Sequence, residues 1–346
     1  MTNKRLHRFF ESHRERGAPL VLATVYETIG STYSKRGARM LIDENGIYTG
    51  MLSGGCVEGD LAIRARAAID TGEAQEVSFE LDADGDDLWG LGVGCDGVMR
   101  ILLQRIDAKG AYEPYTSIAS IEQGRDRARL VTVIASSVES AGATVIVAND
   151  GDVVFDGAAE YSADLSAFAA EPDGLHDSEI DGANVRILVT DLVPDRRLLV
   201  LGAGRDAEPV VRFAVELGWR VTVADHRPAY IDNDAFAEAE EKICCPAAEI
   251  SERKDLDSYD ASVVMSHHLA SDRDYLAQLA RSNVDFVGLL GPAARRVRLL
   301  DEISADETFR QKVRGPVGLD LGGRGPGAIA LSIVAELQQE FARGKP

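Results

Sequence analysis

The feature that most constrains the fold is a glycine-rich turn between an apolar run and a helical period. Residues 198–201 form the apolar run and lead directly into the pattern Gly202-x-Gly204-x-x-Ala207. In such a unit the first glycine makes a tight turn, the second lets the backbone approach a pyrophosphate, and the small third residue allows close helix–strand packing. The helix that follows presents free N–H groups to an anion. The pattern therefore predicts a nucleotide-binding turn, with Gly202, Gly204 and Ala207 as its contacts.

The sequence around this turn alternates between short apolar strands and helical periods. The predicted strands are 198–201, 220–225, 261–266, 286–290 and 317–319, with 242–245 as a weaker candidate. Alternation of this kind favours a parallel sheet with helices on both faces. A last helix over 327–343 places Ala330, Ile333, Val334, Leu337 and Phe341 on one stripe. We therefore predict that residues 194–346 form a Rossmann-like domain with a doubly wound parallel sheet.

Two further positions in this half are candidate ligand contacts. Asp225 ends the second strand, at about the distance from the glycine turn at which a carboxylate binds ribose hydroxyls, and it would favour NAD over NADP. His226 and Arg227 follow directly and could contact a phosphate or an adenine, or form a solvated turn. His267 follows strand 261–266 at the edge where such sheets bind ligands, so it is a candidate cofactor contact, metal ligand or structural residue. The alternative for the whole pocket is that the fold persists without a nucleotide.

Residues 1–193 predict a mixed α+β domain with a β-rich second part. The first part contains predicted helices at 4–16 and 58–71 and strands at 19–25, 40–42, 47–52 and 98–103. Short β-branched runs at 129–135, 143–148, 153–155 and 185–190 predict a mostly antiparallel meander. The stretch 160–182 is acidic and rich in small residues, which predicts a surface loop or an insertion.

Two cysteines of the first half lie in glycine-rich loops. Cys56 follows Gly54 and Gly55 near the start of helix 58–71, and Cys95 follows Gly94. A thiol at a helix N-terminus feels the positive end of the helix dipole, which favours the thiolate. Neighbouring glycines let a large ligand approach the backbone. Both cysteines are candidate ligand contacts, and the alternative for each is a small buried apolar residue.

A compact basic loop, residues 30–39, lies between the predicted strands 19–25 and 40–42. Lys35, Arg36 and Arg39 could bind a phosphate or another oxyanion, or they could form a solvated charged loop. Cys244 and Cys245, by contrast, stand at a predicted strand edge, where a structural role is favoured. The sequence offers no convincing general acid–base set, so we predict no catalytic residue.

Charge and cysteine content exclude several classes of protein. Lys and Arg number 37 and Asp and Glu 57, giving a net charge of −20. This charge argues against broad nucleic-acid binding and against docking on an anionic membrane. Four cysteines in 346 residues are too few for a disulfide scaffold. The N-terminus lacks a signal-like apolar run, and we find no membrane-spanning stretch. We expect a soluble, cytoplasmic protein with reduced thiols.

Several blocks of the chain, in the same order, resemble the XdhC/CoxI family. In the first half they are GSTYSKRGARML (30–41), LSGGCVEGD (52–60) and GLGVGCDG (90–97). In the second half they include VLGAGRDAEPV (200–210), VADHRPAYI (223–231), SHHLASDRDYL (266–276) and GPVGLDLGGRGPGAIALSIVAEL (315–337). The proteins of this family are accessory to molybdenum hydroxylases such as xanthine dehydrogenase and carbon monoxide dehydrogenase. The resemblance implies a chaperone that binds and protects the molybdenum cofactor, assists its sulfuration and delivers it to the hydroxylase.

The resemblance also implies roles for individual residues. Cys56 and Cys95 would face the cofactor and could contact molybdenum, and Gly54, Gly55 and Gly94 would shape their loops. Two positions depart from the family pattern: Asp96 replaces a glycine, and Lys35-Arg36 stands where an Arg and a Pro are usual. Soft thiolates suit the metal half of the cofactor, molybdopterin. The Gly202–Ala207 pocket would suit a nucleotide extension of it.

The resemblance further implies partners: a molybdenum hydroxylase client and a cysteine desulfurase. A homodimer is another candidate, because helix 327–343 is strongly apolar on one side; the alternative is that this face covers the sheet. Two other functions compete with a non-catalytic accessory role. One is an NAD(P)-dependent oxidoreductase that uses the Rossmann-like half. The other is a redox or metal sensor in which Cys56 and Cys95 pair reversibly on oxidation.

Overall fold

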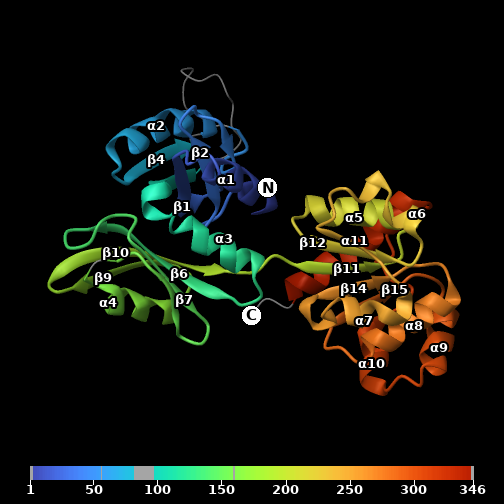
Figure 1. Ribbon diagram of the computed structural model, residues 1–346. Coiled ribbons are helices and arrows are strands. Elements are labelled where there is room, and N and C mark those ends of the chain that lie inside the picture. Colours follow the sequence, from blue (N-terminus) through green and yellow to red (C-terminus); the bar gives the residue numbers. More distant parts are fainter. Residues whose placement is uncertain (1–2, 56, 82–96, 159, 344–346) are drawn as a thin grey trace. The chain divides into compact units, whose positions relative to one another are not determined.

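The structure, a computed structural model, describes residues 3–55, 57–81, 97–158 and 160–343. It divides into two compact units, Met1–Pro194 and Asp195–Pro346 (Figure 1). Within the described ranges no helix is long and apolar enough to cross a membrane.

The first unit begins with a five-stranded antiparallel sheet in the order β3-β2-β1-β5-β4. Its strands are β1 (Leu20–Gly30), β2 (Arg39–Asp43), β3 (Tyr48–Thr49), β4 (Gln75–Leu81) and β5 (Gly97–Ile106). The helices of this part are α1 (Asn3–Arg14), α2 (Glu58–Thr71) and α3 (Tyr115–Gln123), with a 3₁₀ turn η1 at Ala108–Gly110.

Strand β1 is buried on both faces, which is why it reads as a continuous apolar run. On one face Val21, Ala23 and Val25 pack with Leu61 of α2. On the other face Leu20 and Leu22 belong to a cluster that includes residues of α1, α3 and the second sheet. Helix α2 ends where the sequence predicts, at a left-handed residue, Gly72 with φ +75°.

A second antiparallel sheet completes this unit, in the order β8-β7-β6-β10-β9. Its strands are β6 (Ala128–Ser136), β7 (Thr144–Ala148), β8 (Val153–Asp156), β9 (Gly174–Ile180) and β10 (Ala183–Leu192). Helix α4 (Ser162–Ala167) and the 3₁₀ turn η2 (Phe168–Ala170) pack against it. The predicted antiparallel pairing is confirmed, but only β6, β7 and β8 form a meander, because β10 pairs with β6 instead of following β8.

The prediction of a loop over 160–182 is wrong. This stretch contains α4, whose Leu165 is fully buried, and the edge strand β9, which pairs with β10 from Gly174↔Val189 to Ile180↔Ala183. Because β9 lies at the sheet edge, several of its side chains are polar and half-exposed. The polar composition of β9 therefore gives no signal for a strand in the sequence. The hydrogen bonds that hold β9 in the sheet come from β10.

The second unit is a six-stranded parallel sheet in the order β13-β12-β11-β14-β15-β16. Its strands are β11 (Arg197–Leu201), β12 (Arg220–Asp225), β13 (Glu241–Cys244), β14 (Ala261–Val264), β15 (Phe286–Leu289) and β16 (Val313–Arg314). Its helices are α5 (Ala207–Glu216), α6 (Pro228–Ile231), α7 (Ile250–Arg253), α8 (Leu269–Leu279), α9 (Ala293–Glu302), α10 (Glu307–Lys312) and α11 (Pro326–Arg343). The 3₁₀ turns are η3 (Asp234–Phe236), η4 (Ala247–Glu249) and η5 (Leu256–Ser258).

Helices cover both faces of this sheet, as the sequence predicts (Figure 1). Helices α5 and α11 pack on one face and α8, α9 and α10 on the other, each against its own apolar cluster. The chain runs outward from β11 to β12 and β13 and then returns to β14 on the other side of β11. The strand order therefore reverses between β11 and β14, which is where open sheets of this kind bind ligands.

The last predicted strand, 317–319, is wrong. The strand is instead Val313–Arg314, and Pro316, which has no N–H group to donate, interrupts the segment that follows. Val317 is still buried, and its N–H donates to the carbonyl of Leu289 at 3.1 Å. The apolar character of this segment therefore reflects burial, and the segment does not form the regular hydrogen-bond ladder of a strand.

Helix α11 buries the five residues of its predicted stripe in the cluster that it shares with α5. This packing removes the reason for which the stripe suggested a homodimer. Within the same helix, Leu337 is fully buried and Leu331 is 54% exposed.

We expect Leu337→Ala to lower the free energy of unfolding by about 2–5 kcal/mol, because it leaves a cavity between α11 and the sheet. Leu331→Ala is the matched control, and we expect it to change that free energy by less than about 0.5 kcal/mol. Urea unfolding followed by circular dichroism measures both. Equal losses in the two variants would contradict the packing described for α11.

Candidate functional site

The glycine turn of the second unit lies at the point where the strand order reverses. Gly202 has φ +119°, and a Cβ on it would lie 2.6 Å from the Cα and N of Ser266, directly after β14. Only glycine allows this close approach of two backbones. A Cβ on Gly204 would meet the ring of His267 only at 3.8 Å, which is ordinary contact. The His267 ring therefore lies beside the Cβ position of Gly204, and no neighbour among the described residues requires a glycine there.

The carboxylate of Asp225 is not available to a ligand. Its side chain is 1% exposed, and its Oδ2 accepts the N–H of Ala203 in the glycine turn at 2.8 Å. Its Oδ1 accepts the backbone N–H of Arg227 at 2.9 Å, and the Arg227 guanidinium donates to both oxygens at 2.9 and 2.8 Å. The carboxylate is thus fully used by the protein, which argues against the ribose contact predicted from the sequence.

The electrostatics of Asp225 agree with this geometry. Burial raises the pKa of its carboxyl, but hydrogen bonds from Arg227 and from the Ala203 N–H, together with the Arg227 charge, hold that pKa below its ordinary value. Asp225 is therefore ionised at neutral pH, and its charge is balanced by Arg227. Its role in the structure is to fix the glycine turn to the end of β12.

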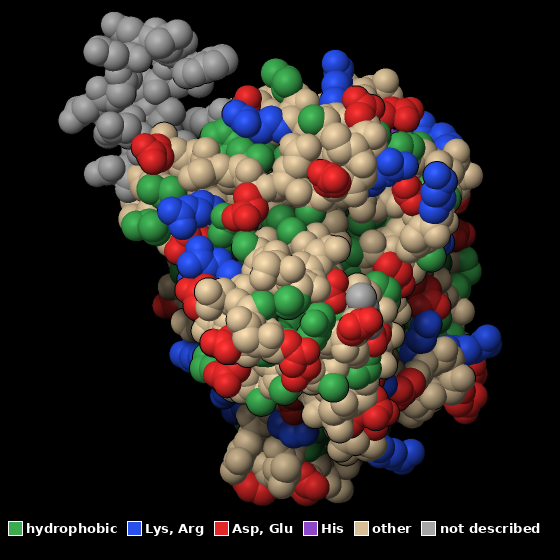
Figure 2. Space-filling view, turned by 90° about the vertical axis from the view of Figure 1, so that its left-hand side faces the viewer, with side chains coloured by type: hydrophobic (Ala, Val, Ile, Leu, Met, Phe, Trp, Pro, Cys, Tyr) green, Lys and Arg blue, Asp and Glu red, His purple; other side chains and the backbone are tan. Residues whose placement is uncertain are grey.

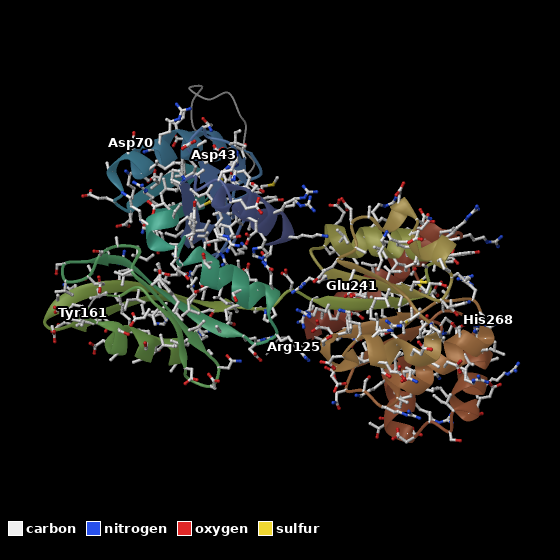
Figure 3. The ribbon with its side chains drawn as sticks, viewed as in Figure 1. Asp43, Asp70, Arg125, Tyr161, Glu241 and His268 are labelled. Carbon is white, nitrogen blue, oxygen red and sulfur yellow. The ribbon has the colours of Figure 1, made fainter. Side chains whose placement is uncertain are left out.

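The loop after β14 brings a histidine to the same edge. His267 has a left-handed backbone, with φ +59°, and its Nε2 lies 2.8 Å from Oδ2 of Asp206, just before α5. Left-handed backbone at a non-glycine residue is costly and is often found at functional sites. The neighbouring His268, labelled in Figure 3, instead caps α8 by accepting the N–H of Ser271. In the described ranges no group of three His, Cys, Asp or Glu side chains is arranged to hold a metal ion.

In the first unit, the basic loop lies against the loop that precedes Cys56. The hydroxyl of Ser34 donates to the carbonyl of Met51 at 3.0 Å. The ring of Tyr33 lies 3.6 Å from the position of a Cβ on Gly54. Gly97, the first residue of β5, pairs with Gly30 at the start of the same basic loop. Described residues that precede Cys56 and one that follows Cys95 therefore contact the segment 30–34.

Cys56, Cys95 and Gly94 lie outside the described residues. Gly54 and Gly55 are described, and both have a left-handed backbone, with φ +81° and +118°. A side chain other than glycine would be strained at either position. The predicted role of these two glycines in shaping the loop is in keeping with that conformation.

Sequence reasoning missed the residue that holds this loop, Glu58. Its carboxylate is 1% exposed, and Oε1 accepts the N–H groups of Leu52 and Ser53, each at 2.8 Å. Oε2 accepts the Ser53 hydroxyl at 2.6 Å and the Gly55 N–H at 3.0 Å. The available signal was an acidic residue in the first turn of α2, directly after a glycine-rich loop with unpaired N–H groups.

The basic side chains of this region separate into two groups. Lys35 and Arg36 are exposed. Arg39 instead points into the unit, where its Nη2 lies 2.8 Å from Oε1 of the buried Glu122, and His7 lies 3.2 Å from the other oxygen. Arg39 therefore stabilises the core, and the anion contact predicted for it is not supported. On the face drawn in Figure 2, acidic and basic side chains are intermingled with apolar ones.

Comparisons with known proteins cover both units. Residues 13–80 match the XdhC and CoxI family, and residues 198–337 match the XdhC Rossmann domain. The chain is 30% identical over 337 residues to a Bacillus subtilis protein named as a probable subunit of xanthine dehydrogenase, covering 97% of this chain and 98% of that protein. It is 20% identical over 324 residues to the "Molybdenum cofactor insertion chaperone PaoD" of Escherichia coli, covering 93% and 83%.

The similarity extends to a solved structure. A crystal structure from Bacillus halodurans, described as a xanthine dehydrogenase, superposes with a TM-score of 0.80 at 27% identity. The match covers 100% of this chain and 97% of that one. The chain is therefore similar to these proteins over its whole length, and not only in the widespread nucleotide-binding fold.

We expect Glu58→Gln to lower the free energy of unfolding by about 2–3 kcal/mol at pH 7, because an amide cannot accept all four hydrogen bonds. Burial raises the pKa of Glu58, but the hydrogen bonds from Ser53 and Leu52 outweigh it and hold the pKa below its ordinary value of 4.5. The stabilisation is therefore fully present above pH 4.5 and is lost as the pH falls through the lowered pKa. Urea unfolding at pH 7 and at acid pH measures the difference.

The exposed Glu73→Gln in the same unit is the control for this variant. It removes one carboxylate without touching the loop, so its effect should be small at either pH. A gap between Glu58→Gln and the wild type that widens on acidification would show that the carboxylate does not act as described.

Proposed function

Because the chain belongs to the XdhC and CoxI family, we propose that it is a chaperone of the molybdenum cofactor. In this role it binds the cofactor, protects it, assists its sulfuration and delivers it to a molybdenum hydroxylase of the xanthine dehydrogenase type. The observation that carries the proposal is the full-length similarity to a molybdenum cofactor insertion chaperone and to a probable subunit of xanthine dehydrogenase. A cysteine desulfurase is the partner that sulfuration would require.

The cofactor is the cargo of such a chaperone, and the residues of the first unit suit its chemistry. Thiolates are soft ligands, so Cys56 and Cys95 would bind the metal end. Their described neighbours Gly55 and Gly97 both belong to segments that contact residues 30–34. The exposed Lys35 and Arg36 next to this segment would bind the anionic phosphate end.

The loop before Cys56 is suited to binding a ligand because Glu58 holds it rigid. Glu58 holds four donors of residues 52–55, so the backbone before Cys56 is fixed before any cargo binds. Preorganised loops lose less conformational entropy on binding, which raises affinity without new contacts. The chain contributes positioning and shielding here, the desulfurase would supply the sulfur, and the client enzyme would use the loaded cofactor.

The second unit would hold a nucleotide at its glycine turn. For a cofactor extended by a nucleotide, the turn Gly202–Ala207 would bind that half of the molecule. One observation favours the alternative, an NAD(P)-dependent oxidoreductase: the exposed His267 pairs with Asp206 at 2.8 Å beside Gly204. A histidine held by a carboxylate is a common general acid or base.

We expect Cys56→Ser and Cys95→Ser each to reduce the molybdenum and pterin that copurify with the protein at least about tenfold, because oxygen is a poorer ligand than sulfur for a soft metal. The exposed Cys244→Ser in the second unit is the matched control and should retain the cargo. Metal analysis and absorbance after coexpression with the cofactor pathway measure both. Undiminished cargo in the double variant would refute the thiol contacts.

We expect Gly204→Asp to weaken binding of a nucleotide-extended cofactor and to leave the unextended cofactor unaffected, because the new carboxylate would repel a pyrophosphate at the turn. Competition between the two forms measures the difference. Equal competition in the wild type, unchanged in Gly204→Asp, would exclude the nucleotide half from this pocket. Steady NADH oxidation with a small substrate, retained in the cysteine variants, would favour the oxidoreductase instead.

A further inference from the structure

We propose that the nucleotide pocket of the second unit selects a ligand with a phosphate on its adenosine ribose, as in NADP, and that Arg227 is the residue that selects it. The inference rests on the alternative given under the proposed function, in which the glycine turn binds NAD(P), and not on the nucleotide half of a molybdenum cofactor. It reverses the preference for NAD that Asp225 suggests when the sequence is taken alone.

First, the carboxylate of Asp225 is not available to accept hydrogen bonds from the hydroxyls of a ribose. A carboxylate offers about four lone-pair positions. In Asp225 four donors fill them: the N–H of Ala203, the N–H of Arg227, and the Nε and Nη2 of the Arg227 guanidinium. With a side chain that is 1% exposed, Asp225 could accept ribose hydroxyls only if the ion pair and the glycine turn both opened.

The second step is that Arg227 keeps donors for a ligand. Its side chain is 33% exposed, and a guanidinium has five N–H donors, of which Asp225 takes two. Its guanidinium carbon lies 3.7 Å from the centroid of the Tyr230 ring. The ion pair and the ring together hold the guanidinium plane in place. Its remaining N–H donors can therefore bind a phosphate without loss of side-chain freedom.

The third step concerns the charges around this position. His226, beside Arg227, is exposed, and its Nδ1 lies 3.4 Å from Asp225, so its ring can add a hydrogen bond to a ligand. Two acidic side chains at the start of α5 have partners: Asp206 lies 2.8 Å from His267, and Glu208 accepts the Asn233 amide at 3.1 Å. A ligand at the end of β12 therefore meets Arg227 and His226, while the balancing carboxylate of Asp225 is buried behind them.

The position of Arg227 determines which phosphate it would bind. In a nucleotide-binding sheet of this kind, the residues after the second strand face the adenosine ribose. A carboxylate there binds the free 2′- and 3′-hydroxyls, whereas an arginine accommodates a 2′-phosphate. Because the Asp225 carboxylate is already fully hydrogen-bonded and Arg227 retains N–H donors, the pocket suits a ribose that carries a phosphate.

Isothermal titration of the full-length protein with adenosine 2′,5′-bisphosphate and with AMP tests this proposal. We expect the bisphosphate to bind at least about tenfold more tightly to the wild type, since charge-assisted bonds to the 2′-phosphate have no counterpart in AMP. In Arg227→Gln the ratio should fall to about one, and the affinity for AMP should hold or rise, because Asp225 loses its guanidinium partner. Arg227→Lys, which keeps the charge but not the fork, should give an intermediate ratio.

Arg212→Gln is the matched control, since it removes an exposed arginine that lies over the Phe213 ring in the same unit. It should keep the ratio of the wild type. A wild-type ratio near one, a preference for AMP, or binding of neither nucleotide would overturn the proposal, as would a ratio that survives in a folded Arg227→Gln protein. Cargo retention by Cys56 and Cys95 is measured separately, so failure here and failure of the chaperone role are distinguishable.

Discussion

Buried carboxylates that accept backbone N–H groups are the interaction on which both candidate sites depend. Glu58 holds residues 52–55, Asp225 holds the glycine turn, and Asp272 accepts the N–H and hydroxyl of Ser266. The loops held by Glu58 and Asp225 are rich in glycine and have few side chains with which to pack. Unpaired N–H groups there would be costly, and so would an uncompensated buried charge. Each carboxylate and its loop therefore stabilise one another.

In both units a buried carboxylate fixes a loop, but the side chains exposed near that loop differ in their chemistry. In the first unit the fixed loop precedes Cys56 in the sequence and contacts Tyr33 and Ser34, which adjoin Lys35 and Arg36, so the proposed ligand would be soft at one end and anionic at the other. In the second unit the buried carboxylate orients Arg227 outward. A chain with a net charge of −20 thus presents local positive groups where an anionic ligand would bind.

Much of the fold could be predicted because its signals are local. The parallel strands β11, β12, β14 and β15 are buried on both faces, so they read as apolar runs, and the stripe of α11 has the helical period. Two predictions failed for physical reasons. The edge strand β9 has half-exposed polar residues and depends on β10 for its hydrogen bonds, and residues 317–319 are apolar without forming a ladder.

By itself the sequence determined the order of the elements, the glycine turns and the family resemblance, because strand and helix periods and positive φ angles are properties of short segments. Only the tertiary structure decided which charged groups pair. Arg39 turns inward to Glu122, 83 residues away, and Asp225 closes on Ala203 and Arg227 instead of facing a ligand. Burial selects these partners, and burial depends on the packing of the whole unit, which no local pattern encodes.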